Sequence, residues 1–353
     1  MQTTKSRDTI KQVHPDIPGW ERKIMRWLRL SRSLQVKVYH GYGHTKSMVV
    51  YGHVISLGPS PRKKYTNRLW INLFALIRLF IVRPVKYVNV RLKWEGKVIQ
   101  SRTDKAGFFK LEWSAGTKVA FGWHKIKVEM TDDKGNVLST GAGSIFIPHS
   151  TQFGFISDID DTFLISHSSD LWKRLYVLFT KNALSRMPFE GVVEHYRLLA
   201  HAHTPKEEPN PFFYVSSSEW NLYDYILKFT VVRELPPGVF LLSPLKRFSE
   251  LLKTGQNRHS GKFMRISRIL KAFPKQKFIL LGDSSQQDPY IYASIIDHFP
   301  GRIHAVYIRD VHHKNQSKVE EVLLNLESKG VTCCFFRHSY EAIIHSRNIG
   351  LIE

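Results

Sequence analysis

Cysteine is scarce in this sequence of 353 residues, and the two that occur, Cys333 and Cys334, are adjacent within an apolar run. Such a pair excludes a disulfide framework and a CxxC zinc site, so we interpret both as strand residues in a reducing compartment. The polar stretch 1–16 also lacks the apolar core of a secretory signal. We therefore expect a cytoplasmic protein.

Long apolar runs are missing as well. The longest run, 69–82, is interrupted by Asn72 and Arg78, and it is shorter than the roughly 20 residues that a membrane-spanning helix needs. Two interpretations stay open for this run: a buried connecting helix, or a helix that lies on a membrane surface.

Acidic residues are few relative to basic ones. The sequence has 52 Lys and Arg but 30 Asp and Glu, which gives a formal net charge of +22. An excess of this size concentrates anionic partners near the surface, whether nucleic acid, an anionic membrane or a phosphorylated substrate. We expect no nucleic-acid partner, because no recognition motif and no platform of aromatic and basic residues accompanies the charge.

The apolar pattern divides the chain into parts, and a hydrophobic content of 42% can fill more than one core. Apolar residues alternate with polar ones in much of 34–150, and turn signals at 103–108 and 132–136 separate the runs. We predict a β-sandwich-like domain over 34–150 with a helical insertion near 67–82. A basic N-terminal segment, 1–33, precedes it.

From Phe153 onward, short apolar strands alternate with helix-like segments. Such alternation predicts an α/β domain, here 151–353, with a doubly wound, mainly parallel sheet whose ligands bind beyond the carboxyl ends of the strands. The expected strands are 153–156, 212–215, 278–281, 303–308 and 331–336, and the expected helices are 192–201, 221–229, 262–273, 290–299 and 317–328.

Clustered carboxylates follow two of these strands. Asp158, Asp160 and Asp161 come after the first strand, and Asp283 and Asp288 come after the strand that begins at 278. Carboxylates in one place repel each other unless a cation joins them, and Mg²⁺ prefers oxygen ligands and retains substrate phosphate in its shell. The clusters therefore favour a magnesium site for phosphoryl chemistry, with an acidic turn or helix cap as the alternative.

Hydroxyl and ammonium groups occur between the two acidic clusters. Ser216 and Ser217 follow the strand 212–215 and can bind a phosphate oxygen where a helix begins, although a serine run is also a common helix cap. Lys262 begins an expected helix and can neutralise charge on a phosphate, or it can be a solvated surface lysine. We interpret the four signals together, because each one borders a strand.

The order of these residues resembles the four-motif set of haloacid-dehalogenase-type phosphatases. That set consists of DxDxT at Asp158, Asp160 and Thr162, a strand that ends in Ser216, then Lys262, then GDxxxxD with Asp283 and Asp288. Residues 153–311 are most similar to the phosphatidate phosphatase catalytic domain of the actin-patch type. Residues 36–148 resemble, more loosely, the β-rich region that precedes this domain in bacterial members.

The resemblance implies a haloacid-dehalogenase-like Rossmannoid fold and Mg²⁺-dependent hydrolysis through an aspartyl-phosphate. Asp158 would be the nucleophile, and Asp160 would protonate the leaving oxygen and later deprotonate water. The phosphate would be held by Thr162, Ser216, Ser217 and Lys262. The metal ligands would be Asp158, the backbone carbonyl of Asp160, Asp283 and Asp288.

The resemblance also implies phosphatidate or a related anionic lipid headgroup as the substrate, reached from the inner face of a membrane by a peripheral protein. The basic and apolar segment 166–187 is a candidate cap over the site, or a helix packed on the sheet edge. Two further functions stay open: a phosphatase for a soluble phosphoester or phosphoprotein, and a non-catalytic module that binds anionic lipid. Relatives that only bind lose the acid/base aspartate, so the presence of Asp160 argues for catalysis.

Overall fold

The computed structural model describes residues 30–31, 34–59, 79, 82–149, 153–159, 189–244, 258–284, 287–311 and 315–353. The chain divides into two compact units. Residues 1–147 and 245–253 form the first unit, and residues 148–244 and 254–353 form the second.

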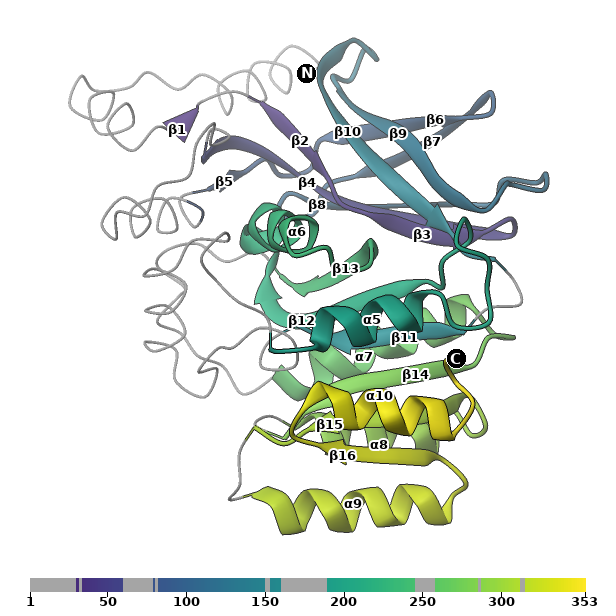
Figure 1. The fold of residues 1–353 in the computed structure, drawn as a ribbon. Helices are drawn as coiled ribbons and strands as arrows, with labels where there is room; N and C mark the ends of the chain where they lie inside the picture. The colour runs from purple at the N-terminus through teal and green to yellow at the C-terminus, as the bar shows by residue number, and fades with distance from the viewer. Residues whose placement is uncertain are drawn as a thin grey trace. The chain divides into compact units, whose positions relative to one another are not determined.

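The first unit is a sheet of ten strands, in which β3 pairs with β10 in parallel and the other pairings between described strands are antiparallel (Figure 1). Its strands are β1 (Leu30–Ser31), β2 (Gln35–Val38), β3 (Gly41–His44), β4 (Ser47–Pro59), β5 (Arg83–Pro84), β6 (Asn89–Trp94), β7 (Lys97–Arg102), β8 (Phe108–Trp113), β9 (Gly122–Thr131) and β10 (Val137–Ile147).

The long strand β4 explains why hydrogen bonds connect all ten strands. Its 13 residues pair first with β3 and β8, and further along with β2, β5 and β1. The β-rich character that we predicted is confirmed, and the strand pairing is mainly antiparallel. The strands form one continuous hydrogen-bonded sheet instead of the two separate sheets of a simple sandwich, because β4 changes partners along its length.

The core of the first unit follows from alternation along its strands. In β6 and β8 every second side chain is buried, and the core contains Val50, Val54, Leu92, Leu111 and Val128. Burial of one such side chain contributes about 1.5–3 kcal/mol to the free energy of folding, relative to an exposed side chain. The predicted insertion near 67–82 lies outside the described residues apart from 79 and 82, and so does the segment 1–33 apart from 30 and 31.

The second unit is a six-stranded sheet in the order β13-β12-β11-β14-β15-β16, and each of its strand pairings is parallel. Helices α5 (Val192–Ala200) and α10 (Ser339–Asn348) cover one face of this sheet, and α7 (Arg258–Ala272) and α8 (Asp288–His298) cover the other (Figure 1). Its strands are β11 (Gly154–Asp158), β12 (Phe212–Glu219), β13 (Gly238–Ser243), β14 (Phe278–Asp283), β15 (Ile303–Arg309) and β16 (Thr332–Phe336).

The five helices that we expected in the second unit are present, and their ends differ from the expected ones by up to four residues. The helices of this unit are α5 (Val192–Ala200), α6 (Tyr223–Val232), α7 (Arg258–Ala272), α8 (Asp288–His298), α9 (Gln316–Ser328) and α10 (Ser339–Asn348), with a 3₁₀ turn at Trp220–Leu222. The parallel sheet and the five expected strands are confirmed, whereas β13 and α10 were not predicted. None of the helices in the described part of the chain is long and apolar enough to span a membrane.

Candidate active site

Asp158 and Asp283 are the last residues of two neighbouring parallel strands, β11 and β14. All side chains of both strands are buried, which is the pattern of a sheet covered on both faces. The strand order reverses between β11 and β14, since the chain first adds β12 and β13 on one side of β11 and then returns to the other. Ligands of parallel α/β sheets bind at such a reversal, beyond the carboxyl ends of the strands.

A third carboxylate reaches the same edge from α8. Oxygens of Asp158, Asp283 and Asp288 lie within 4.8 Å of one another, and all three residues are buried. Asp288 is the first residue of α8, so the positive end of the helix dipole stabilises its charge. A Cβ atom at Gly282 would lie 2.7 Å from Asp288 Oδ2, and the glycine therefore allows α8 to approach β14.

Lys262 joins two of these carboxylates. Its Nζ lies 2.7 Å from Asp158 Oδ1 and also forms an ion pair with Asp288 Oδ1, and the residue is 2% exposed. Burial lowers the pKa of Lys262, but the attraction and hydrogen bonds of Asp158 and Asp288 outweigh burial and raise this pKa well above its usual value. The prediction that Lys262 begins its helix is wrong, because α7 already starts at Arg258.

The three carboxylates fit a divalent metal ion. When ionised they carry three negative charges, and Lys262 forms ion pairs with two of the three carboxylates. In addition, Asp288 Oδ2 is buried and has no hydrogen-bond partner among the described residues. Buried, excess carboxylate charge calls for a cation, and carboxylate oxygens are the ligands that Mg²⁺ prefers. The set therefore fits the magnesium site that we expect.

The serines lie at the adjacent strand end. Val215 of β12 is the register partner of Asp158, so Ser216 follows at the same edge of the sheet. Ser216 is buried, and its Oγ accepts a hydrogen bond of 2.9 Å from the backbone N–H of Ser218, while Ser217 is half-buried. The helix-cap alternative for these serines is wrong, because β12 continues to Glu219 and the N-cap residue of α6 is Leu222.

Two predicted site residues, Asp160 and Thr162, lie outside the described residues. The same holds for Asp161 and for the candidate cap segment 166–187. The structure thus brings together Asp158, Asp283, Asp288 and Lys262 and places Ser216 and Ser217 at the neighbouring strand end.

Sequence patterns did not single out Tyr196. The Ser157 hydroxyl donates to the carbonyl oxygen of Asp158 at 2.7 Å, and it lies 2.8 Å from the hydroxyl of Tyr196 in α5. Burial raises the pKa of Tyr196 well above its usual value, although the hydrogen bond to Ser157 opposes this shift. A neutral phenol therefore supports the strand end that carries Asp158. No spacing rule connects positions 157 and 196, which explains why the contact was missed.

Arg309 fixes the end of β15, next to Asp283 in register. Its guanidinium lies 4.5 Å from the ring centroid of Phe189 and 4.8 Å from that of Phe336, and it donates to Ser339 Oγ at 2.7 Å. Ser284 continues the turn after Asp283 and accepts the N–H of Val311 at 3.0 Å. These contacts make the edge rigid where the carboxylates meet.

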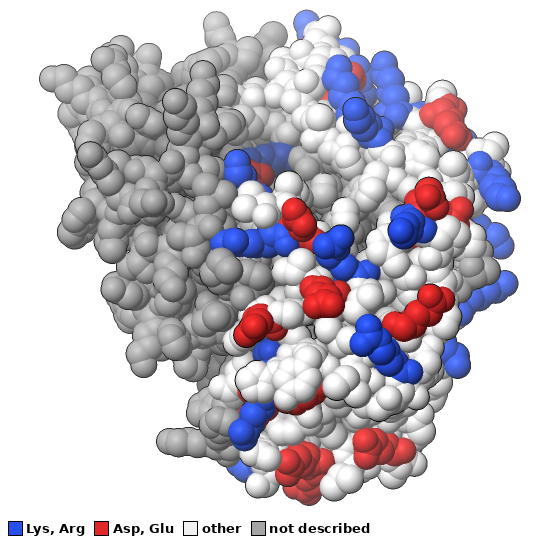
Figure 2. Space-filling view, viewed as in Figure 1, with Lys and Arg blue, Asp and Glu red and all other residues white. Residues whose placement is uncertain are grey.

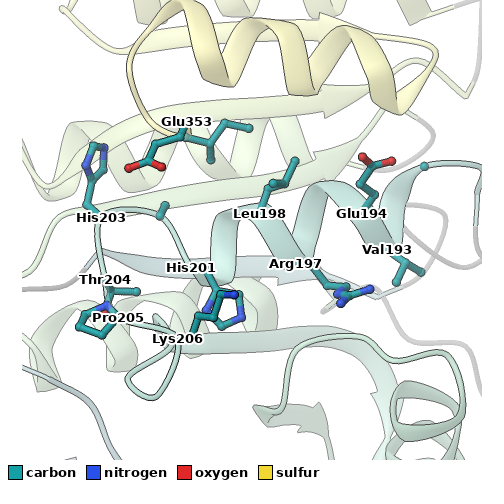
Figure 3. Close-up of a pocket in the computed structure, with 13 residues that line it drawn as sticks. Val193, Glu194, Arg197, Leu198, His201, His203, Thr204, Pro205, Lys206 and Glu353 are labelled. Carbon is teal, nitrogen blue, oxygen red and sulfur yellow. The ribbon is translucent and has the colours of Figure 1, made fainter.

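A cavity of about 1010 Å³ lies elsewhere on the second unit, along α5 and the turn after it (Figure 3). Its polar lining includes the exposed side chains of Glu194, Arg197, His201 and Lys206. None of the predicted site residues lines it. The carboxylates stay the candidate site, because solvated surface groups lack the burial that strengthens electrostatic interactions in an active site.

Solved structures that resemble the chain do so weakly. A carbohydrate acetylesterase from Xanthomonas citri is 10% identical with a TM-score of 0.29, and the match covers 86% of this chain and 68% of that chain. A bacterial immunoglobulin-like domain from the M. primoryensis ice-binding adhesin is 12% identical with a TM-score of 0.18, over 33% of this chain and 98% of that chain. Scores this low assign no fold.

Sequence relatives point to one family. The chain is 34% identical over 164 residues to Phosphatidate phosphatase APP1 of Saccharomyces cerevisiae, which covers 44% of this chain and 25% of the relative. It is 27% identical over 248 residues to Uncharacterized protein C29B5.04c of Schizosaccharomyces pombe, which covers 68% of this chain and 37% of the relative. The chain thus matches 25% and 37% of the length of these two relatives. The family model described as the catalytic domain of Phosphatidate phosphatase APP1 matches residues 153–310, so this part of the chain is similar to that catalytic domain.

Proposed function

We propose that the chain is a Mg²⁺-dependent phosphatidate phosphatase with a haloacid-dehalogenase-like catalytic domain. It hydrolyses phosphatidate to diacylglycerol and phosphate through an aspartyl-phosphate. The observation that supports this proposal is the buried cluster of Asp158, Asp283 and Asp288 with Lys262, inside the segment that matches the phosphatidate phosphatase family.

Asp158 is the nucleophile in this proposal. A carboxylate oxygen attacks phosphorus in line, a P–O bond to Asp158 forms, and the P–O bond to the leaving lipid oxygen breaks. Lys262 lies 2.7 Å from Asp158 Oδ1, so it orients the carboxylate and favours its ionised form. Ser157 fixes the backbone of Asp158 through the 2.7 Å hydrogen bond to its carbonyl oxygen.

Asp160 protonates the leaving oxygen and then removes a proton from the water that hydrolyses the aspartyl-phosphate. Phosphate oxygens are held by Thr162, Ser216 and Ser217, of which Ser216 and Ser217 lie at the described site edge. Asp158, Asp283, Asp288 and the backbone carbonyl of Asp160 would hold Mg²⁺, which would supply positive charge to offset the charge on phosphate.

The reaction is tested with the purified full chain on phosphatidate, lysophosphatidate, diacylglycerol pyrophosphate and soluble phosphoesters, with and without Mg²⁺. We expect phosphate release from phosphatidate that requires Mg²⁺, is lost in EDTA and drops sharply in Asp283→Ala. Asp297→Ala, which removes an exposed carboxylate of α8, is the matched control and keeps activity. Full activity after exhaustive chelation excludes the metal, and hydrolysis of soluble phosphoesters alone excludes the lipid substrate.

The surface charge sets how the chain would reach a membrane. On the face in Figure 2, Lys and Arg are interspersed with Asp and Glu across the described residues. A basic side chain next to an anionic leaflet contributes about 1 kcal/mol. We therefore expect reversible binding that depends on the net charge of +22 and weakens as salt screens it.

Vesicle flotation measures this binding. Recovery of the chain with vesicles is expected to increase with their phosphatidate content and to fall at high salt. Strong binding without turnover favours the non-catalytic lipid-binding module. Equal recovery with neutral and anionic vesicles at low salt contradicts the membrane proposal.

A further inference from the structure

Arg265 is a second buried cation on the helix that carries Lys262. The two residues are three positions apart on α7, so their side chains lie on the same face of the helix. Arg265 is 8% exposed, and its Nε is buried without a hydrogen-bond partner. Neither a hydrogen bond nor an ion pair of this side chain is found within the described part of the chain.

The guanidinium lies near the acidic cluster. Burial is the main cause that lowers the pKa of Arg265 to about 10, Arg268 lowers it further, and attraction to Asp158 opposes the shift. A Cβ atom at Gly261 would lie 3.3 Å from Arg265 Nη1. The side chain thus extends back along the helix, over the residue next to Lys262, and the glycine leaves room for it.

An unpaired buried guanidinium costs stability, because it loses water without gaining a partner. Lys262 does not have this problem, since Asp158 and Asp288 both contact it. For the same reason, the charge of Lys262 is already compensated before any substrate arrives. A phosphate dianion that enters the site needs a cation that the carboxylates have not taken.

We propose that Arg265 binds the phosphate dianion of the substrate at the carboxylate cluster. The planar fork of an arginine donates two parallel hydrogen bonds to phosphate oxygens, which a lysine cannot do. This proposal rests on the proposed function, because it assigns a residue to the phosphate of that reaction. Phosphatidate and inorganic phosphate share the group that Arg265 recognises.

Three variants of the full chain test the assignment: Arg265→Gln, Arg265→Lys and, as matched control, Arg268→Gln. Arg268 is an exposed arginine of the same helix. The Kd of inorganic phosphate is measured by calorimetry in the presence of Mg²⁺, KM is measured on phosphatidate vesicles, and Tm is measured without ligand. We expect Arg265→Gln to raise both the Kd of phosphate and the KM for phosphatidate by roughly 10- to 100-fold. Arg265→Lys is expected to retain part of the affinity, and Arg268→Gln to behave as wild type.

The Tm separates a binding role from a structural one. Removal of an unpaired buried charge is not expected to lower Tm, so Arg265→Gln loses affinity without losing stability. Unchanged Kd and KM in Arg265→Gln overturn the proposal, and so does failure of both Arg265 variants to fold. If the wild type neither binds phosphate nor hydrolyses phosphatidate, the proposed function itself fails. If it does both and Arg265→Gln matches it, only the role of Arg265 fails.

Discussion

Lys262 compensates the charge of two carboxylates of the site. It connects the end of β11 with the beginning of α8 through Asp158 and Asp288. Removing one member of a buried charge group leaves the others uncompensated, which costs about 3–5 kcal/mol. We therefore expect Lys262 to act both in folding and in the proposed chemistry, and the two roles need separate measurements.

We predict that Asp158→Asn abolishes phosphate release while the chain stays folded, and that Asp160→Asn does the same. Asn has nearly the shape of Asp, but it is a poor nucleophile and cannot act as acid and base. Loss of such a group lowers kcat by several powers of ten. Single-turnover assays and circular dichroism check both statements, and near-normal turnover in Asp158→Asn refutes the assignment of the nucleophile.

Lys262→Met is predicted to lower the free energy of unfolding by about 3–5 kcal/mol in EDTA. Because the folded-state pKa of Lys262 is raised, its contribution is fully present below the unfolded pKa of about 10.4 and is lost as pH rises through the higher folded value. Urea unfolding is therefore expected to show the same deficit from pH 6 to 9. Lys271→Met, an exposed lysine of α7, is the control, and an equal deficit there removes the special role of Lys262.

At the residue scale, the sequence predicted the carboxylates better than the cations. Asp158 and Asp283 are predictable because each lies at the end of a recognisable strand. Arg265 was missed because a chain with 52 Lys and Arg gives no sign of which arginine is buried. Burial of a charged side chain depends on what packs over it, and this is a property of the tertiary fold.

Among the elements, β14 and α8 depend on one glycine for their close approach. A Cβ at Gly282 would meet Asp288 Oδ2 at 2.7 Å and the ring and hydroxyl of Tyr292 at 2.9 Å. The hydroxyl of Tyr292 donates to the carbonyl oxygen of Leu281 at 2.9 Å, so this ring has little room to move. The helix would have to shift as a whole.

Gly282→Ala is therefore predicted to lower Tm by several degrees and to reduce activity at least tenfold, since the shift carries Asp288 away from the cluster. Gly301→Ala is the control, because φ at Gly301 is +72° and no atom lies within 4 Å of its added Cβ. That variant lowers Tm through backbone strain but keeps activity. Thermal melts and phosphate-release assays compare the two, and full activity in Gly282→Ala contradicts the role of this contact.

The elements that the sequence missed lack a strong pattern of their own. β13 is a short apolar run, Gly238–Ser243, without the alternation of apolar and polar residues that marks a half-buried strand. In α10 the apolar Ile343 and Ile344 are adjacent, and one of them is buried while the other is exposed. Adjacent apolar residues do not define one helix face, so packing against the sheet determines this helix more than its sequence period does.

At the scale of the whole molecule, each compact unit contains a buried histidine. His53, in the first unit, lies 2.9 Å from the hydroxyl of Tyr39, and His195, in the second, lies 3.0 Å from Ser346 Oγ. Burial lowers the pKa of His53 to about 4 and, with Arg309 and His345 adding to it, that of His195 to about 3. Asp104 opposes the shift of His53, and Lys37 adds to it.

Both histidines are therefore predicted to make their units acid-sensitive. The unfolded histidine, with a pKa of about 6.5, takes up a proton that the folded one does not, so stability falls as pH drops from 6.5 toward the folded value. Hydrogen exchange between pH 7 and 4 reports each unit separately. We expect His53→Gln to reduce the acid sensitivity of the first unit and His195→Gln that of the second, and wild-type slopes in both variants contradict this account.

The parallel pairing of β11 with β14 has a consequence for the newly made chain. At a synthesis rate of about 5–20 residues per second, the roughly 120 residues that separate Gly154 from its partner Phe278 take about 6 to 24 s to follow. During that interval β11 lacks one neighbour, and until residue 262 has been made its carboxyl end also lacks Lys262. The nascent chain thus carries an open apolar strand edge, which can pair with other chains, and Asp158 leaves the ribosome about 100 residues before its counter-charge Lys262.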